Sequence, residues 1–246
     1  MDRRDMRIRR PMKADVVVFD LDDTLYEEMS FVRGGFRAVA AWLEREVPGA
    51  RAETCYACMM EELARHGRGR VFDAVLERIG RRATRQAVAA CVQVYRRHEP
   101  DLTLYPDAER ALRELDAEGV PVYIVTDGHP GVQAAKLKAL GLAGRPPVRR
   151  CYLTRRYGLR HEKPSPHCFL RICERESVPP GRVVYVGDNP RKDFVGIRPL
   201  GFRTVRIMRG AHAGVELDEA HEAEARVRNL DEFMDWLTGV KQSAKG

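Results

Sequence analysis

The sequence predicts an α/β fold built on a parallel sheet, with an all-helical domain inserted after the first strand. Three apolar runs, Val16–Phe19, Val120–Val125 and Val183–Val186, are continuous and do not alternate with polar residues. Such runs are typical of strands that are buried on both faces, as in a parallel sheet. Helical patterns separate the later runs, whereas residues 27–100 contain no convincing strand.

The remaining strands and the core helices follow from weaker patterns. Phe202–Ile207 and Arg150–Thr154 are the fourth and fifth predicted strands. Apolar residues at three- and four-residue spacing predict helices over 106–118, 131–140 and 230–238. A further helix is expected to begin at Ser165 and Pro166, with the serine as N-cap and the proline in the first turn.

The long interval after the first strand predicts a separate domain. Helices are expected over roughly 29–47, 51–66, 71–79 and 84–98, and a single strand-to-helix crossover does not need this length. We therefore divide the chain into a core of residues 14–26 and 101–240, a helical insertion of residues 27–100, and tails of residues 1–13 and 241–246.

Composition excludes several classes of protein. The chain has 246 residues, of which 44% are hydrophobic and 32% charged, and this balance is globular. It has no apolar run of about 18 residues for a membrane helix and no apolar segment of a secretory signal near its N-terminus. We therefore expect a cytoplasmic protein with no membrane partner. The net charge is +7, but the arginines are scattered and interleaved with acidic residues. The sequence has no basic stripe interleaved with aromatic residues, so no nucleic acid partner is expected.

Common metal and nucleotide motifs are also lacking. Cys55 and Cys58 form a C-x-x-C pair, but no second ligand pair follows at zinc-site spacing. Their spacing favours buried cysteines on one helix face. The sequence also lacks the glycine-rich P-loop of nucleoside triphosphatases.

Polar residues gather after three of the predicted strands. The carboxyl ends of parallel strands meet at one edge of a sheet, where ligands bind. The residues concerned are Asp20, Asp22 and Asp23 after the first strand, Thr126, Asp127 and Gly128 after the second, and Asp188 and Asp193 after the run that ends at Val186. We expect the backbone N–H of Gly128 to be open to an anion.

Charge balance indicates what this edge binds. Asp20, Asp188 and Asp193 would repel one another unless cations are present. Lys163 precedes a predicted helix on the same side, and we expect its side chain to lie exposed at the rim as a counter-charge. One Mg²⁺ ion together with Lys163 would balance the three carboxylates and allow a phosphate dianion to bind.

Together these motifs resemble the haloacid dehalogenase (HAD) superfamily, in the subgroup with a helical cap inserted after the first strand. The four motifs occur in the family's order and spacing over residues 14–240. The matching residues are Asp20, Asp22 and Thr24 in the first motif, Thr126 in the second, Lys163 in the third, and Gly187, Asp188, Asn189 and Asp193 in the fourth.

The resemblance implies a Rossmann-like core and a Mg²⁺-dependent phosphatase that acts on a small phosphorylated metabolite. Asp20 would be the nucleophile that forms an aspartyl-phosphate, and Asp22 would be the general acid and then the general base. The implied metal ligands are Asp20, the backbone carbonyl of Asp22, and Asp188. Asp193 would bind the metal directly, bind it through water, or orient Lys163.

The resemblance also implies the residues that bind the phosphoryl oxygens: Thr126, Lys163 and the turn formed by Asp127 and Gly128. Asp127 departs from the pattern, because many members of the family have Asn or another neutral residue there. An additional anion beside the phosphate would weaken binding, so we expect this side chain to point outward, as turn aspartates commonly do.

Two alternative functions remain open on the same fold. A carbon–halogen hydrolase is disfavoured because halide leaves without a proton and such an enzyme would not need Asp22. A non-catalytic binding or regulatory protein is disfavoured because every catalytic position of the motifs is intact. The sequence leaves the substrate open among sugar phosphates, nucleotides and small acids, and it leaves the oligomeric state open.

Overall fold

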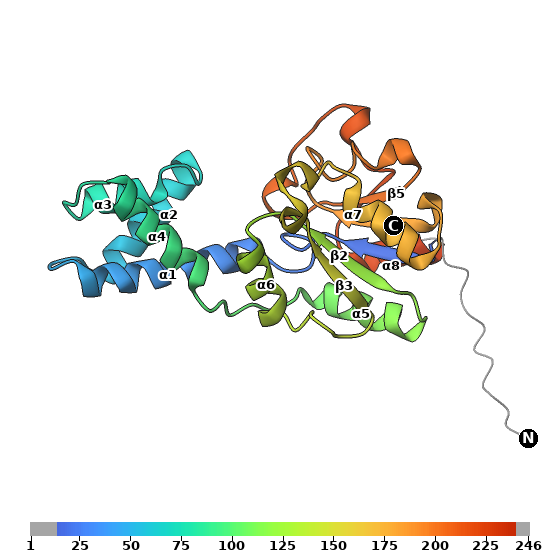
Figure 1. Cartoon of the computed structure of the whole chain (residues 1–246), viewed down its shortest axis with the longest axis horizontal. Coiled ribbons are helices and arrows are strands. Elements are labelled where there is room, and N and C mark those ends of the chain that lie inside the picture. Colours follow the sequence, from blue (N-terminus) through green and yellow to red (C-terminus); the bar gives the residue numbers. More distant parts are fainter. Residues whose placement is uncertain (1–13, 240–246) are drawn as a thin grey trace, which may run out of the picture. The chain divides into compact units, whose positions relative to one another are not determined.

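The computed structural model describes residues 14–239, which divide into two compact units (Figure 1). Of the described residues, unit 1 contains those up to Glu27, Thr103–Gln133 and those from Leu140 onward. Unit 2 contains Glu28–Leu102 and the short stretch Ala134–Ala139. The predicted tails, residues 1–13 and 241–246, lie outside the described residues.

Unit 1 is built on a parallel sheet. Over the described residues the sheet has six strands in the order β3-β2-β1-β4-β5-β6, and every pairing is parallel. The core is therefore Rossmann-like: the chain first builds outward on one side of β1 and then returns to the other side. The strands are β1 (Val16–Phe19), β2 (Val122–Thr126), β3 (Val148–Leu153), β4 (Val183–Gly187), β5 (Arg203–Ile207) and β6 (Ala225–Val227).

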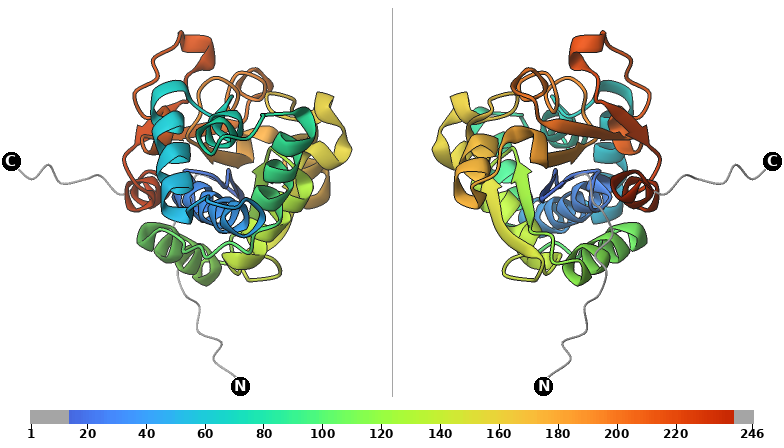
Figure 2. Two further views of the ribbon diagram at one scale, coloured as in Figure 1. Left: turned by 90° about the vertical axis from the view of Figure 1, so that its left-hand side faces the viewer. Right: turned by 90° about the vertical axis from the view of Figure 1, so that its right-hand side faces the viewer.

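Helices cover both faces of this sheet (Figure 2). On one face α7 (His167–Glu176) packs Phe169 and Ile172 into a cluster with Val16 and Val18 of β1. On the other face the ring of Phe19 meets Phe233 of α8 (Leu230–Thr238) edge to face, with centroids 5.8 Å apart. Burial on both faces explains why β1 is apolar at every position.

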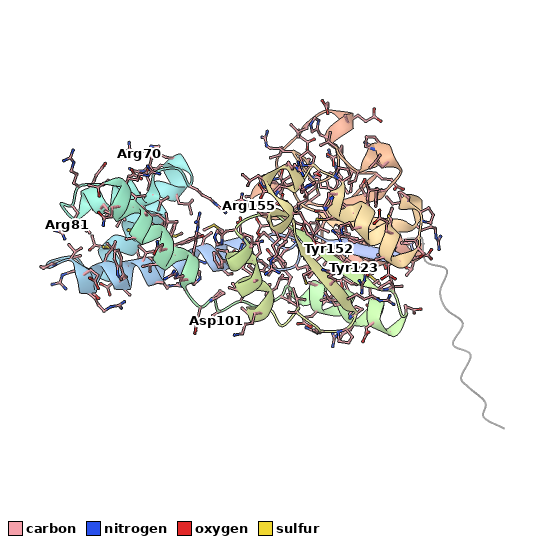
Figure 3. The ribbon with its side chains drawn as sticks, viewed as in Figure 1. Arg70, Arg81, Asp101, Tyr123, Tyr152 and Arg155 are labelled. Atoms are coloured by element: carbon pink, nitrogen blue, oxygen red, sulfur yellow. The ribbon has the colours of Figure 1, made fainter. Side chains whose placement is uncertain are left out.

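One further helix and one aromatic pair complete the core of unit 1. α5 (Pro106–Ala117) packs against α8, and α6 (Pro130–Ala139) follows β2. Tyr123 of β2 and Tyr152 of β3 lie side by side on neighbouring strands, with ring centroids 6.1 Å apart (Figure 3).

The predicted elements differ from the structure mainly at their ends. The second predicted strand begins two residues later than expected and includes Thr126, and the fifth begins two residues earlier and ends one residue earlier than expected. The prediction lacks β6, a three-residue edge strand in which only Val227 is buried. The helix expected from Ser165 begins at His167, with Pro166 as its N-cap.

Unit 2 is helical and has a hydrophobic core of its own. The core includes Leu43, Met59 and Val75 and the buried thiols of Cys55 and Cys91, whereas Cys58 is partly exposed. None of the helices in residues 14–239 is long and apolar enough to cross a membrane. The helices of the insertion are α1 (Glu28–Glu46), α2 (Ala52–His66), α3 (Val71–Arg78) and α4 (Arg85–Arg97).

The chain leaves and re-enters unit 1 at neighbouring points. The backbone N–H of Tyr105 donates to the carbonyl of Leu25 over 2.9 Å. Because this bond joins the residues that flank the helical segment, the insertion does not interrupt the pairing of β1 with β2.

Replacing Phe169 with alanine should destabilise the protein. Phe169 is 1% exposed, and its ring packs against Tyr185 at 4.8 Å and Phe202 at 5.9 Å between centroids. Loss of this ring should lower the free energy of unfolding by about 3–5 kcal/mol, as measured by urea denaturation. The control is Leu170→Ala on the same helix, where the side chain is 39% exposed. An equal loss in the two variants would contradict this packing.

Candidate active site

The strand register brings three loop segments to one edge of the sheet. Phe19 is aligned with Ile124 on β2 and with Val186 on β4. The N–H of the next residue, Asp20, donates to the carbonyl of Val186 over 2.8 Å. β2 and β4 lie on opposite sides of β1, so the order in which strands are added to the sheet reverses here. This edge is therefore the switch point at which doubly wound sheets bind ligands.

Three buried carboxylates lie together at this edge. Asp20, Asp188 and Asp193 each place an oxygen within 4.8 Å of the others. Burial raises the pKa of Asp20 to about 6. Burial, together with the charges of Asp193 and Asp20, raises the pKa of Asp188 to about 9. A buried cluster of like charges such as this one can hold a divalent cation, which would relieve the repulsion.

Lys163 lies inside this cluster. Its Nζ is 2.9 Å from Oδ1 of Asp20 and 2.8 Å from Oδ1 of Asp193. Burial alone would lower the pKa of Lys163, but Asp193 and Asp20 raise it well above its ordinary value. The expectation of an exposed rim lysine is wrong, since the side chain is 1% exposed. A lysine can be buried when its charge is paired, and here two carboxylates pair with it.

Tyr185 and Gly187 of β4 support this ion pair, and sequence reasoning missed both roles. Nζ of Lys163 donates to the Tyr185 hydroxyl over 2.9 Å, and that hydroxyl donates to Asp193 Oδ1 over 3.0 Å. A Cβ at Gly187 would lie 2.4 Å from Asp193 Oδ2, so this position requires glycine. In the sequence Tyr185 is one more large residue of a buried strand, and nothing distinguishes it.

Gln133 of α6 joins the first and second motifs. Its Nε2 donates to Asp22 Oδ2 over 3.0 Å and to Thr126 Oγ1 over 2.6 Å. The hydroxyl of Tyr26 donates to Oδ1 of Asp22. The carboxylate two residues after Asp20 is thus held in place by two donors. Sequence reasoning missed Gln133 because a single glutamine in a helical pattern gives no signal.

Asp127 does not point outward as expected. Its Oδ1 accepts from Thr154 Oγ1 over 2.7 Å and from the N–H of Lys163 over 3.0 Å, while Nζ of Lys192 lies 2.9 Å from Oδ2. Burial alone would raise the pKa of Asp127, but the charges of Lys163 and Lys192 lower it below its ordinary value. The prediction failed because the cations that neutralise this turn aspartate come from other segments.

The backbone N–H of Gly128 is also not open as expected. It donates to Oε1 of Glu162 over 3.2 Å. Glu162 is itself paired with Arg155, whose Nε lies 2.9 Å from the same oxygen, and Figure 3 labels this arginine. A protein carboxylate therefore occupies the position that sequence reasoning assigned to an anion.

Asp23, the third aspartate of the first motif, is held by the loop that follows β5. Asp23 has a positive φ of 51°, and its Oδ2 accepts from the N–H of Ala211 over 3.1 Å. The Arg209 guanidinium donates to the carbonyls of Asp23 and Thr24 and stacks over the Tyr105 ring, 4.0 Å from its centroid. These contacts fix the backbone just after Asp22.

Fold and site together define a Rossmann-like α/β protein with a buried carboxylate centre at the switch point of its parallel sheet. The model of the haloacid dehalogenase-like hydrolases matches residues 14–201. The chain belongs to this family of hydrolases.

Characterised relatives and solved structures agree with this assignment. A glyceraldehyde 3-phosphate phosphatase from Methanopyrus kandleri is 34% identical over 93% of this chain and 98% of its own length. An HAD hydrolase from Bacillus subtilis, whose structure is bound to magnesium, matches with a TM-score of 0.66 and 19% identity, over 92% of this chain and 99% of that one. The L-2-haloacid dehalogenase from Xanthobacter autotrophicus matches with a TM-score of 0.56 and 22% identity, over 93% and 100%.

Replacing Lys163 with methionine should strongly reduce stability as well as activity. The change leaves Asp20 and Asp193 buried without their shared counter-charge. We expect a loss of about 3–5 kcal/mol in the free energy of unfolding, measured in buffer without divalent cations. Lys138→Met, at an exposed lysine of α6, is the control and should leave stability nearly unchanged. An unchanged unfolding transition in Lys163→Met would show that the ion pair contributes little.

Proposed function

We propose that the protein hydrolyses a small phosphomonoester through an aspartyl-phosphate on Asp20. The observation that supports this most directly is the pairing of Asp20 with Lys163 beside Asp188 and Asp193, with the held carboxylate of Asp22 two residues away. The phosphatase named among the relatives favours the same chemistry. A sugar phosphate such as a phosphorylated triose is the first substrate class to test, before nucleotides and small acids.

The donor set fits a magnesium ion. Asp20, Asp188 and the backbone carbonyl of Asp22 would hold it, and all of these offer the hard oxygen ligands that Mg²⁺ prefers. When bound, the ion supplies positive charge that stabilises the phosphoryl oxygens. Asp193 would reach the ion through water, because its oxygens accept hydrogen bonds from Tyr185 and from the N–H of Asn189. Its contacts favour the role of orienting Lys163.

The first chemical step uses Asp20 and Asp22. An oxygen of Asp20 forms a bond to phosphorus, and the bond from phosphorus to the leaving oxygen breaks. Asp22 gives its proton to that oxygen, so the product alcohol departs neutral. Thr126 and Lys163 would bind the phosphoryl oxygens, together with the turn at Asp127 and Gly128. The phosphoryl group would have to displace Glu162 to reach the N–H of Gly128.

The second step returns the enzyme to its starting state. Asp22, now a carboxylate, takes a proton from water, and the resulting hydroxide attacks the phosphorus of the aspartyl-phosphate. The bond between phosphorus and the Asp20 oxygen breaks, and inorganic phosphate is released. The two donors on Asp22, from Gln133 and Tyr26, would keep this carboxylate in position for both transfers.

Two alternatives are kept for testing. A carbon–halogen hydrolase would share the fold, as the similarity to a haloacid dehalogenase illustrates. It is disfavoured because a departing halide needs no proton from Asp22. A binding or regulatory protein is disfavoured because Asp20, Asp22 and Lys163 are all present and in contact with partners. Within the proposal, the helical insertion of residues 27–100 acts as a cap domain.

A screen of phosphorylated metabolites with Mg²⁺ tests the function itself. We expect phosphate release from at least one small phosphomonoester. Release of halide from a 2-haloacid without phosphatase activity would favour the first alternative. No turnover of either class, despite tight Mg²⁺ binding, would favour the second.

Activity should depend on a divalent cation. Chelation should abolish phosphate release, and Mg²⁺ should restore it, because the three carboxylates would otherwise repel the substrate. Mg²⁺ should also raise the melting temperature of the wild-type protein, and this rise should be lost in Asp188→Asn, which lacks one proposed ligand. Full activity in excess chelator would exclude the proposed metal.

The variants Asp20→Asn and Asp22→Asn should fail in different ways. An amide at position 20 cannot attack phosphorus, so no phosphoenzyme should form. An amide at position 22 leaves the nucleophile intact but removes the base that activates water. With p-nitrophenyl phosphate, whose leaving group needs little protonation, Asp22→Asn should release a burst of nitrophenolate and accumulate phosphoenzyme. Intact-mass spectrometry would detect one added phosphoryl group. Accumulation in Asp20→Asn instead would require the two roles to be exchanged.

A further inference from the structure

Lys192 and Asp127 form a second charge pair at the same sheet edge, and the proposed mechanism does not use it. Lys192 lies in the loop after β4, between Asp188 and Asp193, and its Nζ is 2.9 Å from Oδ2 of Asp127. The Lys192 side chain is 32% exposed, whereas that of Asp127 is 12% exposed. The lysine therefore keeps an open side while its partner is nearly enclosed.

Asp127 holds this lysine at a defined place. The other oxygen of the same carboxylate accepts from Thr154 Oγ1 over 2.7 Å and from the N–H of Lys163 over 3.0 Å. Two segments of the chain thus fix the carboxylate independently of Lys192. An ammonium group can donate three hydrogen bonds, and Asp127 accepts one of those from Lys192.

The carboxylate that holds Lys192 connects this lysine to the proposed reacting groups. Lys192 is held by a carboxylate that also accepts a hydrogen bond from the backbone N–H of Lys163, whose Nζ lies 2.9 Å from Oδ1 of Asp20, the proposed nucleophile. Its partner Asp127 directly follows Thr126, a proposed ligand of the phosphoryl oxygens. Any phosphoryl group held by Thr126 and attacked by Asp20 would therefore lie close to a second ammonium.

The charges of the pair explain why an aspartate can be present beside a phosphate site. The charges of Asp127 and Lys192 cancel. The pair therefore leaves unchanged the net charge of the remaining site, which consists of Asp20, Asp188, Asp193, Lys163 and a divalent cation. The aspartate allows an additional hydrogen-bond donor to be placed at the site without adding net charge. A neutral residue at position 127 would leave Lys192 without this anchor.

We propose that Lys192, positioned by Asp127, donates a hydrogen bond to an oxygen of the bound phosphoryl group. This inference rests on the proposed phosphatase function and adds a second ammonium to its phosphate site. A charge-assisted bond of this kind is short and stronger than one between neutral groups. The competing explanation is that the pair only ties two loops together and compensates charge.

Binding of inorganic phosphate to the Mg²⁺-loaded protein, measured by isothermal titration calorimetry, distinguishes these explanations. Lys192→Gln should weaken phosphate binding by roughly 10- to 100-fold, because one charge-assisted hydrogen bond is lost. The double variant Asp127→Asn with Lys192→Gln restores the neutrality of the pair but not the charged donor, so its binding should stay as weak. Arg191→Gln removes an exposed positive charge from the same loop and should bind phosphate like the wild type.

Two outcomes would overturn the inference. Wild-type phosphate affinity in Lys192→Gln would show that this lysine does not contact the ligand. Recovery of affinity in the double variant would show that the pair only compensates charge. Thermal unfolding and Mg²⁺ titration of each variant identify any loss that comes from misfolding. Failure of the phosphatase proposal is a separate result, since the wild-type protein would then release phosphate from no phosphomonoester.

Discussion

The ammonium of Lys163 between Asp20 and Asp193 is the interaction on which the rest of the site depends. Two carboxylates would not remain ionised side by side in a buried position without a cation between them. The backbone around the lysine is shaped to bring it there. A Cβ at Gly196 would lie 1.7 Å from the carbonyl oxygen of Pro164, so the loop after β4 can approach the lysine segment only with glycine at this position.

The same constraint explains the residues that surround the ion pair. The Tyr185 hydroxyl bonds to both the ammonium and the Asp193 carboxylate, and it projects from a strand that is otherwise apolar. Arg209 fixes the backbone that follows Asp22 through the carbonyls of Asp23 and Thr24. The geometry of the acidic cluster is therefore set by the sheet and by two supporting loops.

Much of this arrangement could be predicted from the sequence, because it depends on local patterns. Continuous apolar runs identify β1, β2 and β4, and the position of each polar cluster after a strand places Asp20, Thr126 and Asp188 at one edge. The rest depends on contacts between distant segments. The burial of Lys163, the anchoring of Asp127 by Lys192 and the bond from Gly128 to Glu162 each join residues from different loops. A pattern along one segment cannot report such pairs. The edge strand β6 was missed for a simpler reason, since three residues of which only one is buried carry little signal.

The hydrogen bond between the N–H of Tyr105 and the carbonyl of Leu25 holds the two ends of the helical insertion together. The chain departs from the sheet and returns to it at adjacent residues, so the length of the intervening segment does not affect strand register. Doubling a loop adds only about 0.6 kcal/mol to the entropic cost of closing it. The helices also bury their own apolar residues and so do not depend on the sheet for a core. Descendants of one ancestral sheet could therefore exchange, enlarge or shed this segment, and acquire new substrates, while the aspartate centre stayed intact.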